Sequence, residues 1–470
     1  RRNILSLLTL LSAVFIFASC LGSNDQDTTS YGDTAITSFS LGTLVRTMHT
    51  TSSKGVDSIY TTTVTGSNYV FNIDQFGGQV YNTDSLPIGT KPKALCTINS
   101  KNGGTVVYTT IKGDSLSYYS TSDSVDFSSP REFRVYANNG ASYRKYKISV
   151  NVHQQDSDTI EWKNIANNSN IGSLKAMKAV EYNNNIYVFG STGTNTVAYL
   201  SSAIDGKTWN QVQFSRSLSS DSYKSIIING GNAFIISDGE VLKSTNMSDW
   251  VSVNANSNLK QLIGSSTTEL YALNNNNTIS LSKDNGATWS NDNLGNDAGL
   301  LPINDISYTT YNLASNDSTD RVIVVGNRAT SAGDTTAVVW TKLVEYSKGS
   351  TPGSWETVEK SEDNFKNYLP DLTSLVMIPY DNGMLAFGGY GPNSKKTKFS
   401  QFYQSYDSGI TWTNNKHYYF PKGFTCSDTS FTAIKDNDNY IWIFCGNSGQ
   451  VWKGRLNRLG WTKGQSSFLN

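Results

Sequence analysis

The chain has 470 residues, with 38 basic and 38 acidic side chains and a formal net charge of zero. Only 16% of the residues are charged, against a usual quarter, while 37% are hydrophobic. This balance argues against a nucleic-acid-binding protein, which normally carries a basic face, and against a chain that is disordered throughout. The uncharged, turn-forming surplus, with 38 Gly and 26 Tyr, predicts many short strands joined by turns.

Residues 1–19 have the pattern of a signal peptide. Arg1 and Arg2 precede an apolar stretch at residues 4–17 that is too short for a membrane-spanning helix. The stretch ends in Ala18-Ser19-Cys20, which resembles the lipobox of bacterial lipoproteins, with Phe17 in place of the usual Leu. The resemblance implies cleavage before Cys20 and lipid attachment to its sulfur. An ordinary secretory signal is the alternative.

Residues 20–33 are polar and lack apolar periodicity, so they predict a tether. Asp25 and Asp27 resemble the acidic export signal that follows the lipidated Cys of surface lipoproteins in Bacteroidota. We therefore expect an outer-membrane lipoprotein of the cell envelope, held to the membrane by lipid on Cys20 and displayed at the surface.

Residues 34–154 alternate apolar and polar side chains in short runs, which predicts an immunoglobulin-like β-sandwich. The runs at 133–136 and 143–152, with Asn138-Asn139-Gly140 between them, predict a closing β-hairpin. The segment has no Trp, so the Cys–Trp–Cys core of true immunoglobulin domains is absent and only the architecture is predicted.

Three strings in this segment, at residues 71–74, 80–89 and 123–130, resemble the N-terminal domain of the DUF6242 lipoproteins of Bacteroidota. The resemblance implies an immunoglobulin-like β domain placed before a β-propeller. It implies no activity.

All ten Trp lie between Trp162 and Trp461, and several end an Asp-box (BNR) repeat, Ser-x-Asp-x-Gly-x-x-Trp. Two segments match every fixed position and a third has its Asp one place late. In chain order the matching residues are Ser202, Asp205, Gly206 and Trp209; Ser282, Asp284, Gly286 and Trp289; and Ser405, Asp407, Gly409 and Trp412.

The chemistry of the Asp box predicts a structural role. We expect the carboxylate to accept backbone N–H groups in the turn, the Gly to take a positive φ, and the Trp ring to cover the turn. The boxes resemble those of sialidase-type propellers, and the Phe-Gly-Gly string ending at Gly389 is kelch-like.

Residues 158–470 are predicted to form the propeller, so that the whole chain is all-β. Six repeated phrases end at Trp residues 39 to 66 apart, against about 40 to 50 residues for a four-stranded blade. The two longest intervals predict loop insertions at 312–336 and 391–398. Six blades are preferred, with the strand of Trp162 closing the ring; seven blades are the alternative.

No catalytic residue is predicted. Resemblance to sialidases implies an Arg triad with a Tyr nucleophile, and the five Arg of the propeller do not supply it; Arg455 and Arg458 fall in a polar stretch expected to be solvated. The scattered His residues and the absence of a Cys-x-x-Cys spacing predict no metal, and no cofactor is expected. A bridge between Cys426 and Cys445 is left open.

The function predicted is binding. We expect a monomer whose propeller loops and funnel take a glycan or a protein partner, such as another outer-membrane protein. Two alternatives remain: a carbohydrate-active enzyme, similar to a glycoside hydrolase, that uses the funnel, and an assembly factor for an outer-membrane complex.

Overall fold

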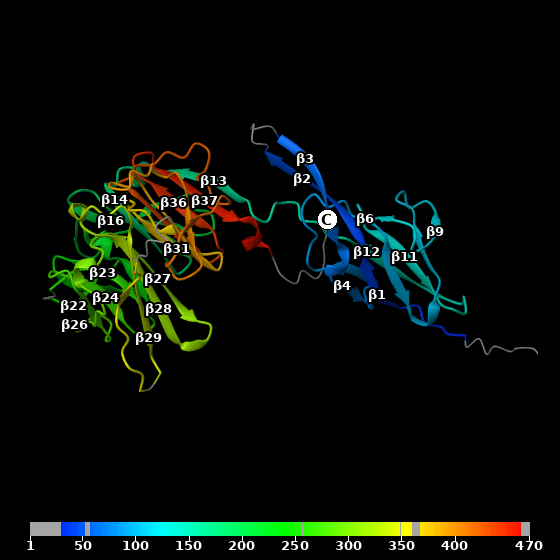
Figure 1. Ribbon diagram of the computed structural model, residues 1–470, viewed down its shortest axis with the longest axis horizontal. Coiled ribbons are helices and arrows are strands. Elements are labelled where there is room, and N and C mark those ends of the chain that lie inside the picture. Colours follow the sequence, from blue (N-terminus) through cyan, green and yellow to red (C-terminus); the bar gives the residue numbers. More distant parts are fainter. Residues whose placement is uncertain (1–29, 52–56, 256–257, 348, 360–366, 462–470) are drawn as a thin grey trace, which may run out of the picture. The chain divides into compact units, whose positions relative to one another are not determined.

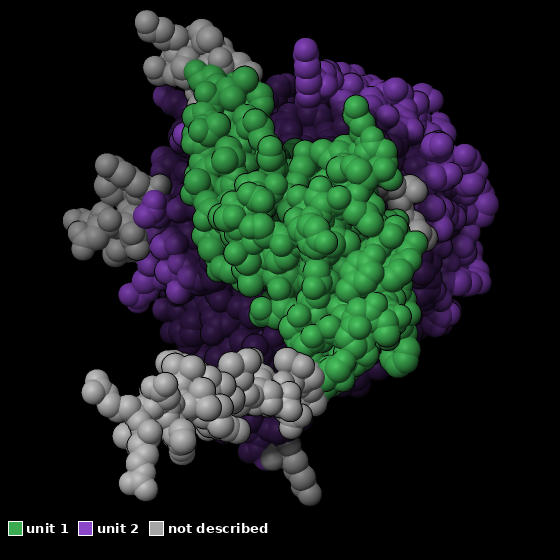
Figure 2. Space-filling model, turned by 90° about the vertical axis from the view of Figure 1, so that its right-hand side faces the viewer, with its two compact units in different colours: residues 1–156, 462–470 green, residues 157–461 purple. Residues whose placement is uncertain are grey.

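The computed structural model describes residues 30–51, 57–255, 258–347, 349–359 and 367–461. The predicted signal peptide at 1–19 and the lipid site at Cys20 lie outside these residues. The chain divides into two compact units, residues 1–156 with 462–470 and residues 157–461 (Figure 2). No helix in the described ranges is both long enough and apolar enough to cross a membrane.

The first unit is a β domain built around a six-stranded sheet (Figure 1). In sheet order its strands are β4 (Phe71–Asp74), β5 (Gln79–Asn82), β12 (Tyr143–Ser149), β11 (Arg131–Tyr136), β8 (Val106–Thr109) and β9 (Leu116–Tyr118). The remaining strands pair as β1 (Ile36–Leu41) with β7 (Cys96–Ser100), β2 (Thr43–Thr51) with β3 (Asp57–Thr65), and β6 (Lys93–Ala94) with β10 (Val125–Asp126). The predicted closing hairpin is confirmed, since β11 and β12 are antiparallel neighbours.

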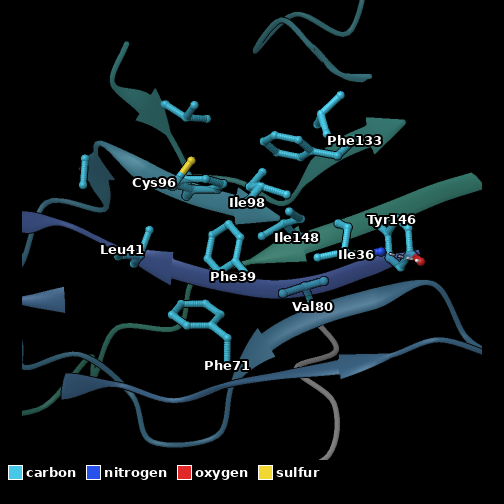
Figure 3. Close-up of a cluster of buried hydrophobic side chains, with 14 of the residues drawn as sticks. Ile36, Phe39, Leu41, Phe71, Val80, Cys96, Ile98, Phe133, Tyr146 and Ile148 are labelled. Carbon is cyan, nitrogen blue, oxygen red and sulfur yellow. Dashed lines mark hydrogen bonds between the residues drawn. The ribbon is translucent and has the colours of Figure 1, made fainter. Parts of the chain in front are cut away.

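The core of the β domain is one cluster fed by the six-stranded sheet and by the β1–β7 pair (Figure 3). Phe133 of β11 and Phe39 of β1 are among its buried rings. Tyr146 is fully buried, and its hydroxyl donates to Gln75 Oε1 at 2.6 Å and accepts from the backbone N–H of Ile36 at 3.2 Å. A satisfied hydroxyl removes the desolvation penalty of a buried polar atom.

The second unit is a propeller, with six sheets in its described residues (Figure 1). Blade 1 has β14 (Ala176–Tyr182), β15 (Asn185–Ser191), β16 (Asn195–Ser202), β17 (Asn210–Gln211) and β18 (Leu218–Ser219). Blade 2 has β19 (Ile227–Asn229), β20 (Asn232–Ser237), β21 (Glu240–Ser244) and β22 (Val251–Asn254). Blade 3 has β23 (Leu259–Ser265), β24 (Leu270–Asn274), β25 (Ile279–Ser282) and β26 (Ser290–Asn291).

The other three blades follow in chain order. Blade 4 has β27 (Asn304–Leu313), β28 (Asn316–Asn327), β29 (Val338–Glu345) and β30 (Glu356–Thr357). Blade 5 has β31 (Val376–Tyr380), β32 (Gly383–Phe387), β33 (Tyr403–Ser405) and β34 (Thr413–Asn414). Blade 6 has β35 (Phe431–Lys435), β36 (Ile441–Cys445), β37 (Gln450–Leu456) and β13 (Ile160–Asn167).

The ring is closed by pairing the first strand of the propeller with the last. β13 lies antiparallel to β37, in a register that runs from Ile160↔Leu456 to Asn167↔Gln450. The indole N–H of Trp162 in β13 donates to the carbonyl of Tyr419 at 2.8 Å. The strand of Trp162 therefore belongs to blade 6, and the described residues of the propeller form six blades, as preferred, and not seven.

The first predicted insertion, at 312–336, is only partly a loop: residues 328–336 connect β28 to β29 without a further strand, but the residues before them do not form a loop. Between Asn312 and Asn327 the chain continues as the hairpin of β27 and β28, which turns at Leu313↔Asn316. The long interval between Trp residues suggested a loop, but these residues lengthen the hairpin instead. At its exposed far end the Asn312 side chain donates to the carbonyl of Asp317 at 2.8 Å. The second predicted insertion, at 391–398, does lie in a segment without strands between β32 and β33.

Candidate functional site

The main cavity of the propeller is its central channel, with a volume of about 870 Å³. Residues from β14, β19, β23, β27, β31 and β35 line it, one strand from each blade. Each of these strands lies at the end of its sheet. On one edge of each strand, the backbone N–H groups therefore have no acceptor strand within the same blade.

Hydroxyl groups of neighbouring blades accept some of these edge N–H groups. The three pairs are Ala179 N to Thr432 Oγ1 at 3.1 Å, Leu262 N to Ser225 Oγ at 3.3 Å, and Met377 N to Ser307 Oγ at 3.0 Å. They join blade 1 to blade 6, blade 3 to blade 2, and blade 5 to blade 4. The channel wall is thus held by side chains that satisfy buried backbone donors.

Lys178, in the middle of β14, places an amine in the channel. Its Nζ donates to the backbone carbonyl of Lys224 at 3.0 Å, and the side-chain amide of Gln261 lies 3.5 Å from the same oxygen. Burial lowers the pKa of Lys178 to about 8, because removing water disfavours the charged amine. The amine is therefore poised to change charge near neutral pH.

Asp305 supplies a carboxyl group on the β27 side of the channel. Its Oδ1 accepts the backbone N–H of Ser374 at 2.7 Å and its Oδ2 accepts the side-chain amide of Asn327 at 3.0 Å. Burial raises the pKa of Asp305, and these two hydrogen bonds oppose the rise without cancelling it. The same channel therefore holds an amine and a carboxyl group, each shifted toward its neutral form.

Two tyrosines add aromatic surface to this wall. Burial raises the pKa of Tyr223 to about 12 and also raises the pKa of Tyr308. The Lys224 amine lies 6.0 Å from the centre of the Tyr223 ring, and the hydroxyls of Tyr308 and Ser265 are 3.4 Å apart. The channel thus combines hydroxyl groups, an amide and apolar ring faces.

Two further charged groups of the channel, Arg328 and Asp371, have strong protein partners. Arg328 donates to both carboxylate oxygens of Asp334, through Nε at 2.6 Å and Nη2 at 3.0 Å. The carboxylate of Asp371 accepts the backbone N–H groups of Asn393 and Ser394, at 2.7 and 2.9 Å. The charged groups of these residues are therefore already paired within the protein.

The two complete Asp boxes have one geometry. In the first, Asp284 accepts the N–H of Thr288 at 2.9 Å and its hydroxyl at 2.6 Å, while Ser282 Oγ donates to Asp284 at 2.7 Å. Ser282 Oγ also accepts the N–H of Gly286 at 2.9 Å, and the Trp289 indole donates to the Gly286 carbonyl at 2.9 Å.

The second box, from Ser405 through Asp407 and Gly409 to Trp412, repeats these contacts to within about 0.2 Å. In the third box the late Asp205 makes one long bond to the N–H of Lys207, at 3.3 Å. Ser202 Oγ there accepts the N–H of Ile204 at 3.2 Å, and the indole of Trp209 keeps its bond to Gly206, at 2.8 Å.

The glycines of the boxes permit a close approach between blades. Gly206, Gly286 and Gly409 have φ values of +61°, +85° and +90°. A Cβ atom at Gly206 would collide with the Trp442 ring of blade 6, and one at Gly409 would press on Val339 of blade 4. At Gly286 it would press on Val241 of blade 2. The boxes of blades 1, 3 and 5 therefore pack against blades 6, 2 and 4. These are the same three pairs of blades that the hydroxyl groups of the channel connect.

The Asp boxes do not form the channel. They lie in the turns between the third and fourth strands of their blades, and none of their residues lines the cavity. Sequence reasoning missed the channel residues Lys178 and Asp305. Two charged residues within strands could have indicated them. Lys178 interrupts the mostly apolar strand Ala176–Tyr182, and Asp305 is the second residue of β27.

The two C-terminal Arg are half-buried and contact protein groups, so the prediction of simply solvated side chains is corrected. Arg458 donates through both terminal nitrogens to Asp381, whose side chain is 3% exposed, and through Nε to Asp158 at 2.9 Å. The guanidinium carbon of Arg455 lies 4.2 Å from the centre of the Tyr440 ring. The partners are distant in sequence, so the polar local context was misleading.

A second buried charged cluster lies between blades 3 and 4. Lys342, 2% exposed, donates to both carboxylate oxygens of Asp292 at 2.9 and 2.6 Å and lies 3.4 Å from Glu269. Trp355 donates its indole N–H to Asp292 at 2.8 Å, and Tyr271 donates to Glu269. This cluster replaces a standard Asp box at Trp355 and serves the blade interface.

Cys96, Cys426 and Cys445 are free and buried, so the bridge left open by the sequence is not formed in this structure. Burial raises the pKa of Cys96 to about 12 and raises that of Cys445 as well. Among the described residues no cluster of three His, Cys, Asp or Glu side chains is placed to hold a metal ion.

Comparisons with known proteins agree with the two-unit architecture. Residues 156–464 match a family model described as the DUF6242 beta propeller domain. Residues 39–150 match the N-terminal domain of the same family, described as a domain of unknown function. Among curated proteins, none matches the chain.

Solved propeller structures are similar at low identity. YCF48 from Cyanidioschyzon merolae is 13% identical over 63% of this chain and 99% of its own, with a TM-score of 0.35. Trypanosoma rangeli sialidase with the inhibitor DANA is 13% identical over 63% of this chain and 59% of its own, with a TM-score of 0.34. An AA12 carbohydrate-active enzyme of Trichoderma reesei is 10% identical over 64% of this chain and 96% of its own, with a TM-score of 0.37. Scores at this level carry no argument about function.

Proposed function

This chain belongs to the DUF6242 family, and we propose that it is a lipid-anchored protein of the cell envelope whose propeller binds a glycan in the central channel. The anchor is Cys20, in the lipobox-like string that ends the signal peptide. The acidic residues that follow it support display on the outer surface of the outer membrane.

The observation that carries the binding proposal is the channel itself. Its volume of about 870 Å³ falls within the roughly 300–1,000 Å³ of small-molecule sites. An amine, an amide, a carboxyl group and tyrosine hydroxyls converge there between apolar side chains. Sugar rings present hydroxyls at their edges and C–H groups on their faces, so this mixed lining suits them better than it suits a purely apolar ligand.

A glycoside hydrolase is the second candidate, favoured by one specific observation. Asp305 has a raised pKa, as a general acid requires, and the carboxylate of Asp371 contributes to that rise through its charge. Hydrolysis of a glycosidic bond uses two carboxyl groups of this kind. Asp371, however, is already committed to two backbone N–H groups, which favours binding over catalysis.

A glycan array tests the binding proposal, followed by incubation of each bound saccharide with the purified protein and analysis of the products. We expect retention of at least one saccharide class without cleavage. Release of shorter products, lost in Asp305→Asn, would favour the hydrolase. Retention of no saccharide together with capture of one outer-membrane protein would refute the glycan proposal in favour of a protein partner.

The anchor is tested separately by metabolic labelling with a radioactive fatty acid. We expect labelled protein in the outer-membrane fraction and no label in the Cys20→Ala variant. Labelling that persists in the variant would place the lipid elsewhere.

A further inference from the structure

Two lysines of the channel lack an acidic partner among the described residues. Lys178 Nζ contacts the carbonyl of Lys224, and Lys435 Nζ contacts the carbonyl of Asp436 at 3.2 Å. Neither amine lies within 4.0 Å of a carboxylate in the part of the chain that the structure describes. Both side chains are half-buried, and a carbonyl oxygen carries only a partial charge, so it balances less of the ammonium charge than a carboxylate would.

The carboxyl groups of the channel, in contrast, already accept hydrogen bonds from the protein. Asp334 is held by Arg328, while Asp371 and Asp305 accept the bonds described above, and Glu181 accepts the N–H of Asn184 at 2.9 Å. The channel therefore has carboxyl groups that already accept protein hydrogen bonds and two lysines whose amines contact carbonyl oxygens and no carboxylate among the described residues.

The two lysines lie on neighbouring strands of the channel wall. Lys178 is on β14 of blade 1 and Lys435 ends β35 of blade 6, and the bond from Ala179 N to Thr432 Oγ1 joins these strands. Both lysines line the cavity. One side of the channel therefore offers positive charge to any molecule that enters.

We propose that the channel recognises an acidic saccharide, whose carboxylate forms an ion pair with Lys178 while the charge of Lys435 on the next strand adds to the attraction. This inference rests on the proposed function and narrows its ligand class. Gln261, which shares the Lys224 carbonyl with Lys178, and Tyr223 are placed to hydrogen-bond sugar hydroxyls on the same wall.

The pKa of Lys178 supports this assignment. In the empty channel it is lowered to about 8 by burial, and a bound carboxylate would raise it again, so ligand binding and protonation reinforce each other. Binding should therefore be strong below pH 8 and weaken above it. The other titratable or charged groups that line the channel are Glu181, Tyr223, Lys224, Asp305, Tyr308, Arg328, Asp334, Asp371 and Lys435.

The test uses a matched pair of probes, tetragalacturonate and its fully methyl-esterified form, which differ in the carboxylate charge. Binding to the purified protein is measured by isothermal titration calorimetry. We expect the acid to bind at least about tenfold more tightly than the ester, the range of a charge-assisted hydrogen bond. We also expect Lys178→Met to remove that preference, and Lys163→Met, an exposed Lys on β13, to keep it.

Lys178→Arg is the second variant, because an Arg stays charged at every pH of interest. We expect it to retain the preference for the acid and to extend binding above pH 8, where the wild type weakens. Tryptophan fluorescence checks that each variant is folded, since all ten Trp lie within residues 162–461.

The outcomes separate this inference from the proposed function. Equal binding of acid and ester, unchanged in Lys178→Met, would overturn the inference and leave a neutral-glycan site intact. Array hits confined to sulfated saccharides would overturn the carboxylate assignment while keeping the positive site. If no saccharide of any class binds the wild type, both proposals fail.

Discussion

Arg458 and Asp381 form a two-pronged ion pair between the segment that follows the last strand of the propeller and the β31–β32 turn of blade 5, 77 residues earlier. Asp381 also accepts the hydroxyl of the buried Tyr418, at 3.1 Å. Hydrogen bonds to Asp381 raise the pKa of Arg458, which therefore stays charged at any working pH. The pair fastens the end of the propeller to its fifth blade.

Removing one member of this pair should destabilise the propeller. Arg458→Met leaves the Asp381 carboxylate, 3% exposed, without its cation, and we expect a loss of about 3 kcal/mol in unfolding free energy. Arg455→Met, which removes a ring contact and a carbonyl contact, should lose less than about 1 kcal/mol. Urea unfolding followed by Trp fluorescence measures both, and equal losses would contradict the role given to Asp381.

A complete Asp box should contribute more to the unfolding free energy than the box in which the Asp is displaced. Asp284→Ala removes three short contacts of the carboxylate, so we expect a loss of about 1–2 kcal/mol. Asp205→Ala removes one bond of 3.3 Å and should lose about 0.5 kcal/mol or less. The same unfolding measurement ranks the variants, and a larger loss at Asp205 would show that the displaced Asp has a function other than closing its turn.

The complete boxes should also make the propeller sensitive to acid. Hydrogen bonds from Thr288 lower the pKa of Asp284 to about 2, and the pKa of Asp407 is also lowered by its partners in the turn. A carboxyl group with a depressed folded-state pKa contributes stability above its unfolded pKa, near 4, and that contribution is lost as pH falls toward 2. We expect the double variant Asp284→Asn, Asp407→Asn to lose less stability between pH 5 and pH 2 than the wild type.

That comparison has a direct control. Asp205→Asn changes the one box whose Asp is displaced, so its acid profile should follow the wild type. If the double variant and the wild type lose stability in parallel, other carboxyl groups dominate acid unfolding.

Removing a charge from the cluster between blades 3 and 4 should destabilise the protein far more than removing a charge from the surface. Lys342→Met leaves Asp292 buried without its cation, while Glu269 keeps Lys283 at 3.1 Å, and we expect a loss of about 3–5 kcal/mol. The exposed Lys163→Met should change stability by about 0.5 kcal/mol or less. A second variant, Lys342→Met with Asp292→Asn, should recover part of the loss; no recovery would mean that the Lys acts through packing alone.

The thiols should be protected until the protein unfolds. In Cys20→Ala protein we expect almost no reaction with an aromatic disulfide reagent at pH 8, because Cys96, Cys426 and Cys445 are buried. Burial also raises the pKa of the Cys96 and Cys445 thiols, which disfavours their reactive thiolates. Unfolding without reductant should then expose all three to the reagent. Reaction of Cys96 alone would show that Cys426 and Cys445 pair in the exported protein.

The sequence predicted the propeller because its repeats are local. In a complete box, every side-chain contact from Ser to Trp spans four residues or fewer, so spacing alone shows where each turn closes. The segment that ends at Trp250 lacks a complete box but also closes its turn locally, with Asn246 accepting the N–H groups of Ser248 and Asp249.

The candidate site and the Arg contacts could not be predicted in this way. The channel lining comes from six strands spread over residues 176–435, and Lys178 becomes a channel residue only after those strands surround one axis. Arg458 looked solvated because its neighbours in sequence are polar, while its partner lies 77 residues away. Partners that only ring closure brings together leave no periodic signal.

The pairing of β13 with β37 has a consequence for how the protein is made. The first strand of the propeller, β13, pairs with β37 near its end. A chain that stops just before Gln450 therefore has five complete blades and three strands of the sixth, but lacks the strand that joins β13 to β36. The ring of blades can therefore close only after β37 has been synthesised, however many blades have formed before it. An unfinished copy would present an open edge on each side of the gap, which marks it for disposal by any machinery that recognises exposed strands.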